Sequence, residues 1–383
     1  MNTVIAIDSF KGSLTSFEAG NIAAEELSKL FPGSKVNVFP LADGGEGTVD
    51  ALVEGLGGTI EKAEVTGPLG NKLLSRFGFL AEKSMAVIEM ADAAGLTMVP
   101  KEQRNPMNTT TYGLGELILK ALDKGCRQFI IGIGGSATND AGLGMLTALG
   151  ARFVTSDGLP TGVMGKDLFH IASIDLSKLD KRLFESNIMV ACDVNNPLYG
   201  QTGCSFVYGP QKGADQDTVA AMDKAIEKFS LLAKNQCNID GAQMPGAGAA
   251  GGLGYAFHGF LKAHLRPGIQ LILESLNISE ALKNADLLIT GEGRMDFQTS
   301  MGKAPCGVAE FAKSVNPSIL TIAVCGGAAR EAEAVNNAGI DAYFPIIHLP
   351  MTVDEAMEHE TAQINLRQTI IQIGRLIKYT QKK

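Results

Sequence analysis

Hydrophobic and polar positions alternate in a regular way over the first 60 residues. Residues 3–8 (TVIAID) are a continuous apolar run that predicts a buried strand, and the helical spacing of apolar positions over 16–31 predicts a helix behind it. A second strand is predicted over 35–42 and a further helix from about Val49. Strand and helix in strict alternation are typical of a parallel sheet.

The same pattern returns at the other end of the chain and differs in the middle. Between residues 63 and 280 short strands follow one another without a helix between them, as at 75–80 and 86–90, before helix–strand units resume. From residue 285 onward the predicted elements are strand 286–290, helix 306–313, strand 319–324, helix 331–337, strand 342–347 and a terminal helix 352–379.

These two styles predict an α/β protein with two dissimilar domains. The chain ends, 1–62 and 281–383, are expected to form one discontinuous, doubly wound domain of the Rossmann or flavodoxin-like kind. Residues 63–280 are expected to form an inserted, mixed α/β domain.

Composition narrows the class of function. The chain has 383 residues and a formal net charge of −8, which argues against nonspecific nucleic-acid or anionic-membrane binding. No apolar run approaches the roughly 20 residues of a spanning helix, and the six cysteines lack metal-ligand spacing. We therefore expect a cytoplasmic protein with free thiols. Glycine is in excess, 45 residues, and collects at the ends of apolar runs, where α/β proteins build ligand-binding loops.

Known phosphate-binding patterns fit the chain poorly, with one exception. The P-loop pattern is absent, and a literal GxGxxG at 246–251 follows no strand, which leaves close packing on a ligand or on another backbone. The segment 132–137 (GIGGSA) does follow a predicted strand. With Asp157 about 20 residues further on, it permits an adenine dinucleotide and hence an oxidoreductase. The polar residues added to this loop favour several phosphate oxygens or a metal instead; they are Ser136, Thr138, Asn139 and Asp140.

Acidic residues stand repeatedly beside glycine or at predicted strand ends, with cations near them. Carboxylates that hold Mg²⁺ or accept a hydroxyl proton, together with Lys and Arg that neutralise phosphate charge, are what phosphoryl transfer requires. The acids are Asp8, Asp43, Glu46, Asp140, Asp193, Glu292 and Asp296, and the cations are Lys11, Lys212, Arg294 and Lys303.

Several long and uncommon sequence motifs of this chain resemble those of bacterial glycerate kinases of the glycerate kinase I type. The resemblance runs in order from about residue 2 to residue 345. It includes 8–14 (DSFKGSL), 42–48 (ADGGEGT), 132–140 (GIGGSATND), 191–194 (ACDV), 209–213 (GPQKG) and 290–296 (TGEGRMD). Three positions depart from the expected pattern: Ile7 replaces proline, Ala141 replaces glycine and Tyr208 replaces phenylalanine.

The resemblance implies ATP-dependent phosphorylation of glycerate with Mg²⁺, in a cleft between two dissimilar α/β domains and without a P-loop. It favours D-glycerate and 2-phosphoglycerate, in the breakdown of sugar acids, organic acids or glyoxylate. Residue types alone do not decide whether the 2- or the 3-hydroxyl group is phosphorylated. They also do not decide between a monomer and a homodimer. A ligand-binding protein without activity on the same scaffold is a further alternative.

Roles for individual residues follow from the charge that glycerate and ATP carry. We expect Lys11 and Arg294 to neutralise carboxylate or phosphate, and Asp193 to act as general base, with Asp296 and then Asp8 as alternatives. Asp43 and Glu46 are expected to act through Mg²⁺. The ATP phosphates are assigned to the glycine-rich loop and to one lysine, namely Gly134, Gly135, Ser136, Thr138, Asn139 and Lys212.

Overall fold

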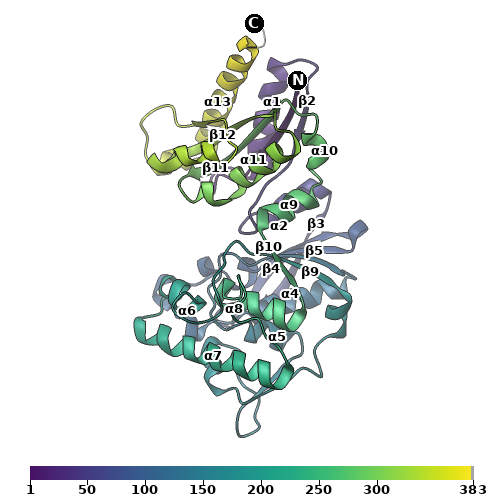
Figure 1. Cartoon of the computed structure of the whole chain (residues 1–383), viewed down its shortest axis with the longest axis vertical. Coiled ribbons are helices and arrows are strands. Elements are labelled where there is room, and N and C mark those ends of the chain that lie inside the picture. The colour runs from purple at the N-terminus through teal and green to yellow at the C-terminus, as the bar shows by residue number, and fades with distance from the viewer. Residues whose placement is uncertain (381–383) are drawn as a thin grey trace. The chain divides into compact units, whose positions relative to one another are not determined.

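The computed structural model describes residues 1–380, which form two compact units (Figure 1). The first unit contains residues 1–43, 50–56 and the chain from 269 onward, and the second contains 44–49 and 57–268. The segment 44–49 thus packs with the second unit although its neighbours on both sides belong to the first. The domain limits expected from the sequence were 1–62 with 281–383 for one domain and 63–280 for the other, and these limits stay a prediction.

The first unit is built on a parallel sheet of five strands in the order β13-β12-β11-β1-β2. In chain order this is 2-1-3-4-5, the flavodoxin-like arrangement, in which ligands bind where the connections from β1 and its neighbour diverge. The doubly wound fold predicted from the chain ends is confirmed. The strands are β1 (Asn2–Ile7), β2 (Lys35–Val38), β11 (Leu287–Met295), β12 (Leu320–Ala328) and β13 (Ala342–Pro345).

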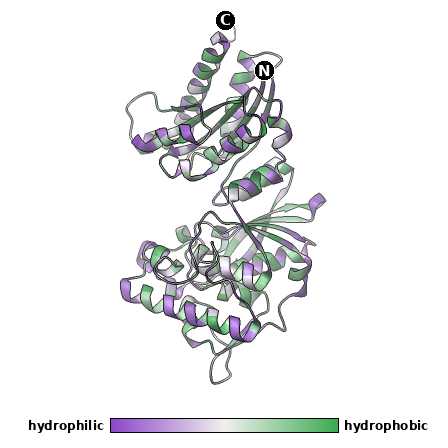
Figure 2. Ribbon diagram, viewed as in Figure 1, coloured by the Kyte–Doolittle hydropathy of each residue, from purple (hydrophilic) through white to green (hydrophobic). Residues whose placement is uncertain are grey.

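Helices cover both faces of this sheet. Helices α1 (Ser16–Leu30) and α13 (His359–Thr380) share one core with β1, β11 and β12, and α11 (Ala304–Val315) lies in a second core on the other face. Figure 2 shows hydrophobic colour along the strands and alternating colour on the helices that cover them, the pattern of an amphipathic helix.

Two predicted helices of this unit differ from expectation. The terminal helix is broken at Glu358, whose ψ of 130° is extended, so the short α12 (Val353–Met357) precedes α13. A capping box of Thr352 and Glu355 starts α12 as a separate element. The segment Arg330–Asn337 forms a 3₁₀-helix instead of an α-helix.

The second unit contains a mixed sheet in the order β10-β9-β6-β5-β4-β3. Its strands β10, β9, β6 and β5 are parallel, whereas β4 runs antiparallel to both β5 and β3. The strands are β3 (Thr59–Thr66), β4 (Lys72–Leu80), β5 (Met85–Glu89), β6 (Gln128–Gly132), β9 (Asn187–Ala191) and β10 (His264–Arg266). A separate antiparallel pair joins β7 (Arg152–Val154) to β8 (Ser173–Asp175).

One large core fills the second unit, and its centre is aromatic. Phe229 of α7 contacts Phe153, Tyr255 and Phe260 with ring centroids 5.9 to 6.4 Å apart. The α-helices of this unit are α3 (Ala91–Ala94), α4 (Tyr112–Asp123), α5 (Leu143–Ala148), α6 (Cys204–Tyr208), α7 (Gln216–Cys237) and α8 (Ala249–Tyr255). The helices α2 (Thr48–Leu56), α9 (Gly268–Ser275) and α10 (Ser279–Leu282) lie mostly or wholly in the first unit. Within residues 1–380 no helix combines the length and apolarity needed to cross a membrane.

Two adjacent glycines of β12 have opposite surroundings. A Cβ placed on Gly326 would lie 2.4 Å from the carbonyl oxygen of Gly293 on β11, a distance that real Cβ atoms do not show. A Cβ on Gly327 would meet no heavy atom within 4 Å. Gly326 is therefore required by the close approach of β11 and β12, and Gly327 is not.

We predict that Gly326→Ala destabilises the protein and that Gly327→Ala does not. The added methyl of Gly326→Ala must push β11 and β12 apart, which costs about 1–3 kcal/mol by the usual range for overpacking. Urea unfolding followed by circular dichroism measures both variants beside the wild type. Equal unfolding midpoints for the two variants would contradict the packing described for Gly326.

Candidate functional site

A pocket of about 650 Å³ lies at the carboxyl edge of the first unit's sheet. Residues that follow β1 line it together with the distal parts of β11 and β12. This is the switch point of a 2-1-3-4-5 sheet, because β1 separates strands whose connections run in opposite directions. Seven of the acids and cations singled out from the sequence line this one pocket: Asp8, Lys11, Asp43, Glu292, Arg294, Asp296 and Lys303.

A tight turn after β1 presents Lys11. The backbone N–H groups of Phe10 and Leu14 each donate to the other residue's carbonyl, at 2.9 and 3.1 Å, and Gly12 between them has a φ of +81°. Phe10 and Leu14 are buried, whereas Lys11 is exposed at the tip. The turn therefore fixes the base of a side chain whose ammonium group remains available to an anion.

Asp8 is the most perturbed acid of the pocket. Its side chain is only 6% exposed, and its Oδ1 accepts a hydrogen bond from the backbone N–H of Ser9 at 2.6 Å. Burial, and after it the charge of Asp43, raise the pKa of Asp8 to about 7. A carboxyl group that is protonated and ionised in comparable amounts near neutrality is sensitive to any cation that enters the pocket.

The distal part of β11 adds both signs of charge. Arg294 is exposed, and Asp296 is half-buried with Oδ1 accepting from the N–H of Gln298 at 2.9 Å. Glu292 is 8% exposed; burial raises its pKa, while a hydrogen bond from Thr299 and the charge of Lys303 oppose the rise. The pocket thus combines carboxylates with three cations, Lys11, Arg294 and Lys303.

The second unit gathers other predicted residues at the carboxyl edge of its own sheet. Gly132 at the end of β6 pairs with Ala191 at the end of β9, so the loops that follow both strands leave the same edge. Segment 44–49 lies against this edge: a Cβ on Gly132 would be 2.3 Å from the carbonyl oxygen of Gly44. Glu46 is exposed on that segment.

Asp193 follows β9 and is held in place. It is exposed, and its Oδ1 accepts a hydrogen bond from the N–H of Gly268 at 2.9 Å. Because β10 pairs with β9, the residues just after the two strands meet, and this explains the contact. An exposed carboxylate fixed by one backbone donor can accept a proton from a bound hydroxyl group.

Lys212 lies beneath the glycine-rich loop. Its side chain is 2% exposed, and Nζ donates to Ser136 Oγ at 2.8 Å and to the carbonyl oxygen of Thr138 at 2.6 Å. Thr138 and Asn139 are buried as well, and only Gly134 and Gly135 of the loop are exposed. The loop therefore offers an incoming anion its backbone, while Lys212 supports that backbone from inside.

Asp140, one of the acids that the sequence places near a strand end, is buried like Lys212. The carboxylate is fully buried and accepts from the N–H and Oγ1 of Thr111 and from the N–H groups of Gly142 and Gly144. The next residue, Ala141, has a φ of +49°. Such a left-handed conformation costs a non-glycine residue about 1–2 kcal/mol, which explains why glycine is expected there.

The loop lacks the geometry of a dinucleotide site. Strand β7, which precedes Asp157, pairs only with β8 and not with β6, and α5 begins at Leu143, well after Ala137. A dinucleotide fold requires the second strand beside the first, with the helix starting at the glycines. The other glycine-rich segment packs on backbone, since a Cβ on Gly251 would be 2.1 Å from the Thr138 carbonyl oxygen.

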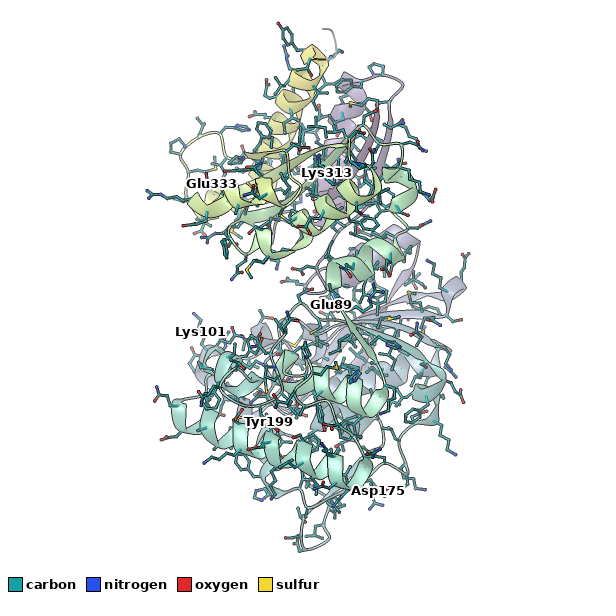
Figure 3. The ribbon with its side chains drawn as sticks, in the orientation of Figure 1. Glu89, Lys101, Asp175, Tyr199, Lys313 and Glu333 are labelled. Carbon is teal, nitrogen blue, oxygen red and sulfur yellow. The ribbon has the colours of Figure 1, made fainter. Side chains whose placement is uncertain are left out.

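One buried acid of this edge was not singled out from the sequence. Glu89 ends β5, is 3% exposed, and accepts a hydrogen bond at Oε1 from the N–H of Val49 at 2.8 Å (Figure 3). The signal was present, because Glu89 closes an apolar run just as Asp8 does. Within residues 1–380 no three His, Cys, Asp or Glu side chains are grouped closely enough to hold a metal by themselves.

The fold is that of a doubly wound α/β protein, and its switch-point pocket, with cations among carboxylates, is the kind of place where such proteins bind small charged ligands. The profile of the Glycerate kinase family matches residues 3–378, and the chain belongs to that family.

Curated relatives span the whole length of the chain. The glycerate kinase of Haemophilus influenzae is 45% identical over 379 residues, with 99% of each chain covered. The glycerate 2-kinase of Escherichia coli K12 is 44% identical over 356 residues and 93% of each chain. A crystal structure from Salmonella typhimurium LT2, provisionally described as glycerate kinase 2, superposes with a TM-score of 0.91 at 43% identity, covering all of both chains.

The buried ammonium group of Lys212 predicts a pH-dependent stability. Desolvation lowers the pKa of Lys212 from 10.5 to about 8. Between these two values the unfolded chain binds the proton that the folded chain has released, so stability due to this residue rises with pH. We predict that the wild type gains stability relative to Lys212→Met as the pH rises from 8 toward 10.

Urea unfolding of both proteins at several pH values measures this difference. Lys228→Met, which removes an exposed lysine of the same unit, is the control and should differ from the wild type by the same amount at every pH. A pH-independent difference for Lys212→Met would contradict the desolvation of its ammonium group.

Proposed function

We propose that this protein transfers the γ-phosphoryl group of ATP to a hydroxyl group of glycerate. Membership of the Glycerate kinase family over nearly the whole chain is the observation that carries the proposal. The charges of the first unit's pocket agree with it, because a donor triphosphate and an acceptor carboxylate both require cations.

The 2-hydroxyl group of D-glycerate is the proposed acceptor. The support is the curated name of the Escherichia coli relative, glycerate 2-kinase, at 44% identity. The substrate would come from reactions that release a short hydroxy acid, as the oxidation of sugar acids or the reduction of glyoxylate products does.

Lys11 and Arg294 are proposed to neutralise the charge of the transferred group. Both are exposed and line the same pocket, and Lys303 adds a third cation there. A loose phosphoryl-transfer transition state spreads charge over its equatorial oxygens, which cations at fixed positions stabilise.

Mg²⁺ fits the donor set of this pocket. Asp8, Asp43 and Glu292 supply carboxylate oxygens, the hard ligands that Mg²⁺ prefers, and the ion typically needs only one or two of them beside phosphate oxygens and water. When bound, Mg²⁺ would neutralise phosphate charge. Glu46, the other predicted metal residue, is exposed on segment 44–49 of the second unit.

Asp193 is the proposed general base for the attacking hydroxyl group. Its exposed carboxylate and its hydrogen bond from Gly268 give it a fixed direction, which proton transfer requires. Asp296 is the next candidate; its Oδ1 likewise accepts a hydrogen bond from the backbone N–H of Gln298, and it is half-buried where Asp193 is exposed. Asp8 is the remaining alternative.

Proton-coupled phosphorus NMR tests the reaction and its position together. We expect the purified protein, with D-glycerate, ATP and Mg²⁺, to yield a monoester signal split into a doublet, because the phosphate of 2-phosphoglycerate has one vicinal proton. A triplet would mean 3-phosphoglycerate and would overturn the position alone. Untouched ATP and no monoester would overturn the kinase activity.

Replacing the proposed base should slow the chemical step. We predict that Asp193→Asn lowers kcat by about 10²–10⁴-fold, the usual contribution of general base catalysis, with KM for glycerate changed little. Asp157→Asn, an exposed aspartate of the same unit, is the matched control and should retain full activity. A kcat for Asp193→Asn within a few-fold of the wild type would exclude Asp193 as the base.

A further inference from the structure

The pocket of the first unit has two chemically different ends. One end carries the charges described above. The other end is apolar and is formed by Phe10, by the residues after β13 and by one face of α12; its members are Phe10, Ile346, Ile347, Val353, Ala356 and Met357. Glycerate is a short acid with oxygen on every carbon, so it has no apolar surface that would use this second end.

Helix α12 contributes almost nothing to the protein's own core. None of its residues is buried, and Val353 and Met357 are 72% and 40% exposed. The helix nevertheless has a defined place beside the Lys11 turn, because a Cβ on Gly12 would lie 2.6 Å from the terminal methyl group of Met357. An apolar helix face held over a charged turn is suited to a ligand that has both characters.

The β12 side of the pocket carries only glycine and alanine, including Ala328 and, just after the strand, Ala329. Gly326 and Gly327 line it, β13 ends at Pro345 beside Cys325, and a Cβ on Gly327 would meet nothing within 4 Å. Because no side chain larger than a methyl group stands on this side, its surface is flat enough for a planar ring to cover. The volume of about 650 Å³ lies within the range of roughly 300–1,000 Å³ found for cofactor-sized ligands.

We infer that this pocket binds the nucleoside of ATP, with the base between α12 and the end of β12 and the phosphates toward Lys11, Arg294 and Lys303. The inference rests on the proposed function and assigns one of its two substrates. It differs from the assignment of the ATP phosphates to the 134–139 loop and Lys212. The ammonium group of Lys212 already donates to two protein oxygens and is 2% exposed.

Gly327→Leu is the steric test. Gly327 does not have a positive φ, and its Cβ position is open, so the new side chain enters the pocket without straining the fold. We expect Kd for ADP, measured by calorimetry without glycerate, and KM for ATP to rise by about tenfold or more, while KM for D-glycerate stays within about twofold. An unchanged urea midpoint confirms that the variant is folded.

Val353→Asp tests the apolar end separately. This side chain is largely exposed, so a charge there should not unfold the protein, but it would face the base. We expect this variant to bind adenosine and ADP more weakly than the wild type and to bind inorganic triphosphate with unchanged affinity. The matched control is Leu349→Asp, an equally exposed apolar residue that does not line the pocket, and it should bind ADP normally.

The possible outcomes separate this inference from the proposed function. A wild-type enzyme that phosphorylates glycerate, with ADP affinity unchanged in Gly327→Leu, overturns the inference alone. A rise of KM for D-glycerate without loss of ADP binding also overturns it and assigns the pocket to the acceptor. If the wild type makes no phosphoglycerate but ADP binding is lost in Gly327→Leu, the nucleotide pocket is supported and the kinase proposal fails.

Discussion

Close approach of one backbone to another is the constraint on which both candidate edges depend. At Gly326 the neighbouring strand leaves no room for a Cβ, at Gly132 segment 44–49 leaves none, and at Gly251 the glycine-rich loop leaves none. Each of these contacts brings bare backbone to the carboxyl end of a sheet, where side chains from other loops can then converge. Glycine is therefore required at these three positions by packing and not by flexibility.

The first unit's pocket holds carboxylates close to one another although their like charges repel. Asp8 is buried beside Asp43, and the cost of that placement is visible in a pKa raised to about 7. Such an arrangement is unfavourable without a counterion and becomes favourable when a cation enters. The protein's own cations, Lys11 and Arg294, are exposed and so remain available to an anionic ligand. The same pocket thus offers carboxylate oxygens and exposed cations side by side.

Much of the fold could be predicted because the spacing of apolar residues along the chain determines which segments form buried strands and amphipathic helices. The buried runs that become β1, β11 and β12 and the amphipathic α1 are visible in the order of the residues. The break of the terminal helix at Glu358 was not, because a capping box at Thr352 competes with a continuous helical pattern. Asp8, Lys11, Asp43, Arg294 and Asp296, which the sequence singled out, line one pocket of the structure, and their roles stay predictions. The spacing of residues could not predict which charged side chains are buried, as Lys212 and Glu89 are.

Buried, hydrogen-bonded groups support the glycine-rich loop of the second unit from inside, and only Gly134 and Gly135 of the loop are exposed. Lys212 binds Ser136 and Thr138 from below, and the four donors around Asp140 fix the chain that follows. Each buried charge is costly unless it is hydrogen-bonded, and here each one is. A loop fixed in this way would lose little conformational entropy on binding a ligand. Lys212, predicted from the sequence to bind the ATP phosphates, and Asp140 thus both hold backbone of this region in place.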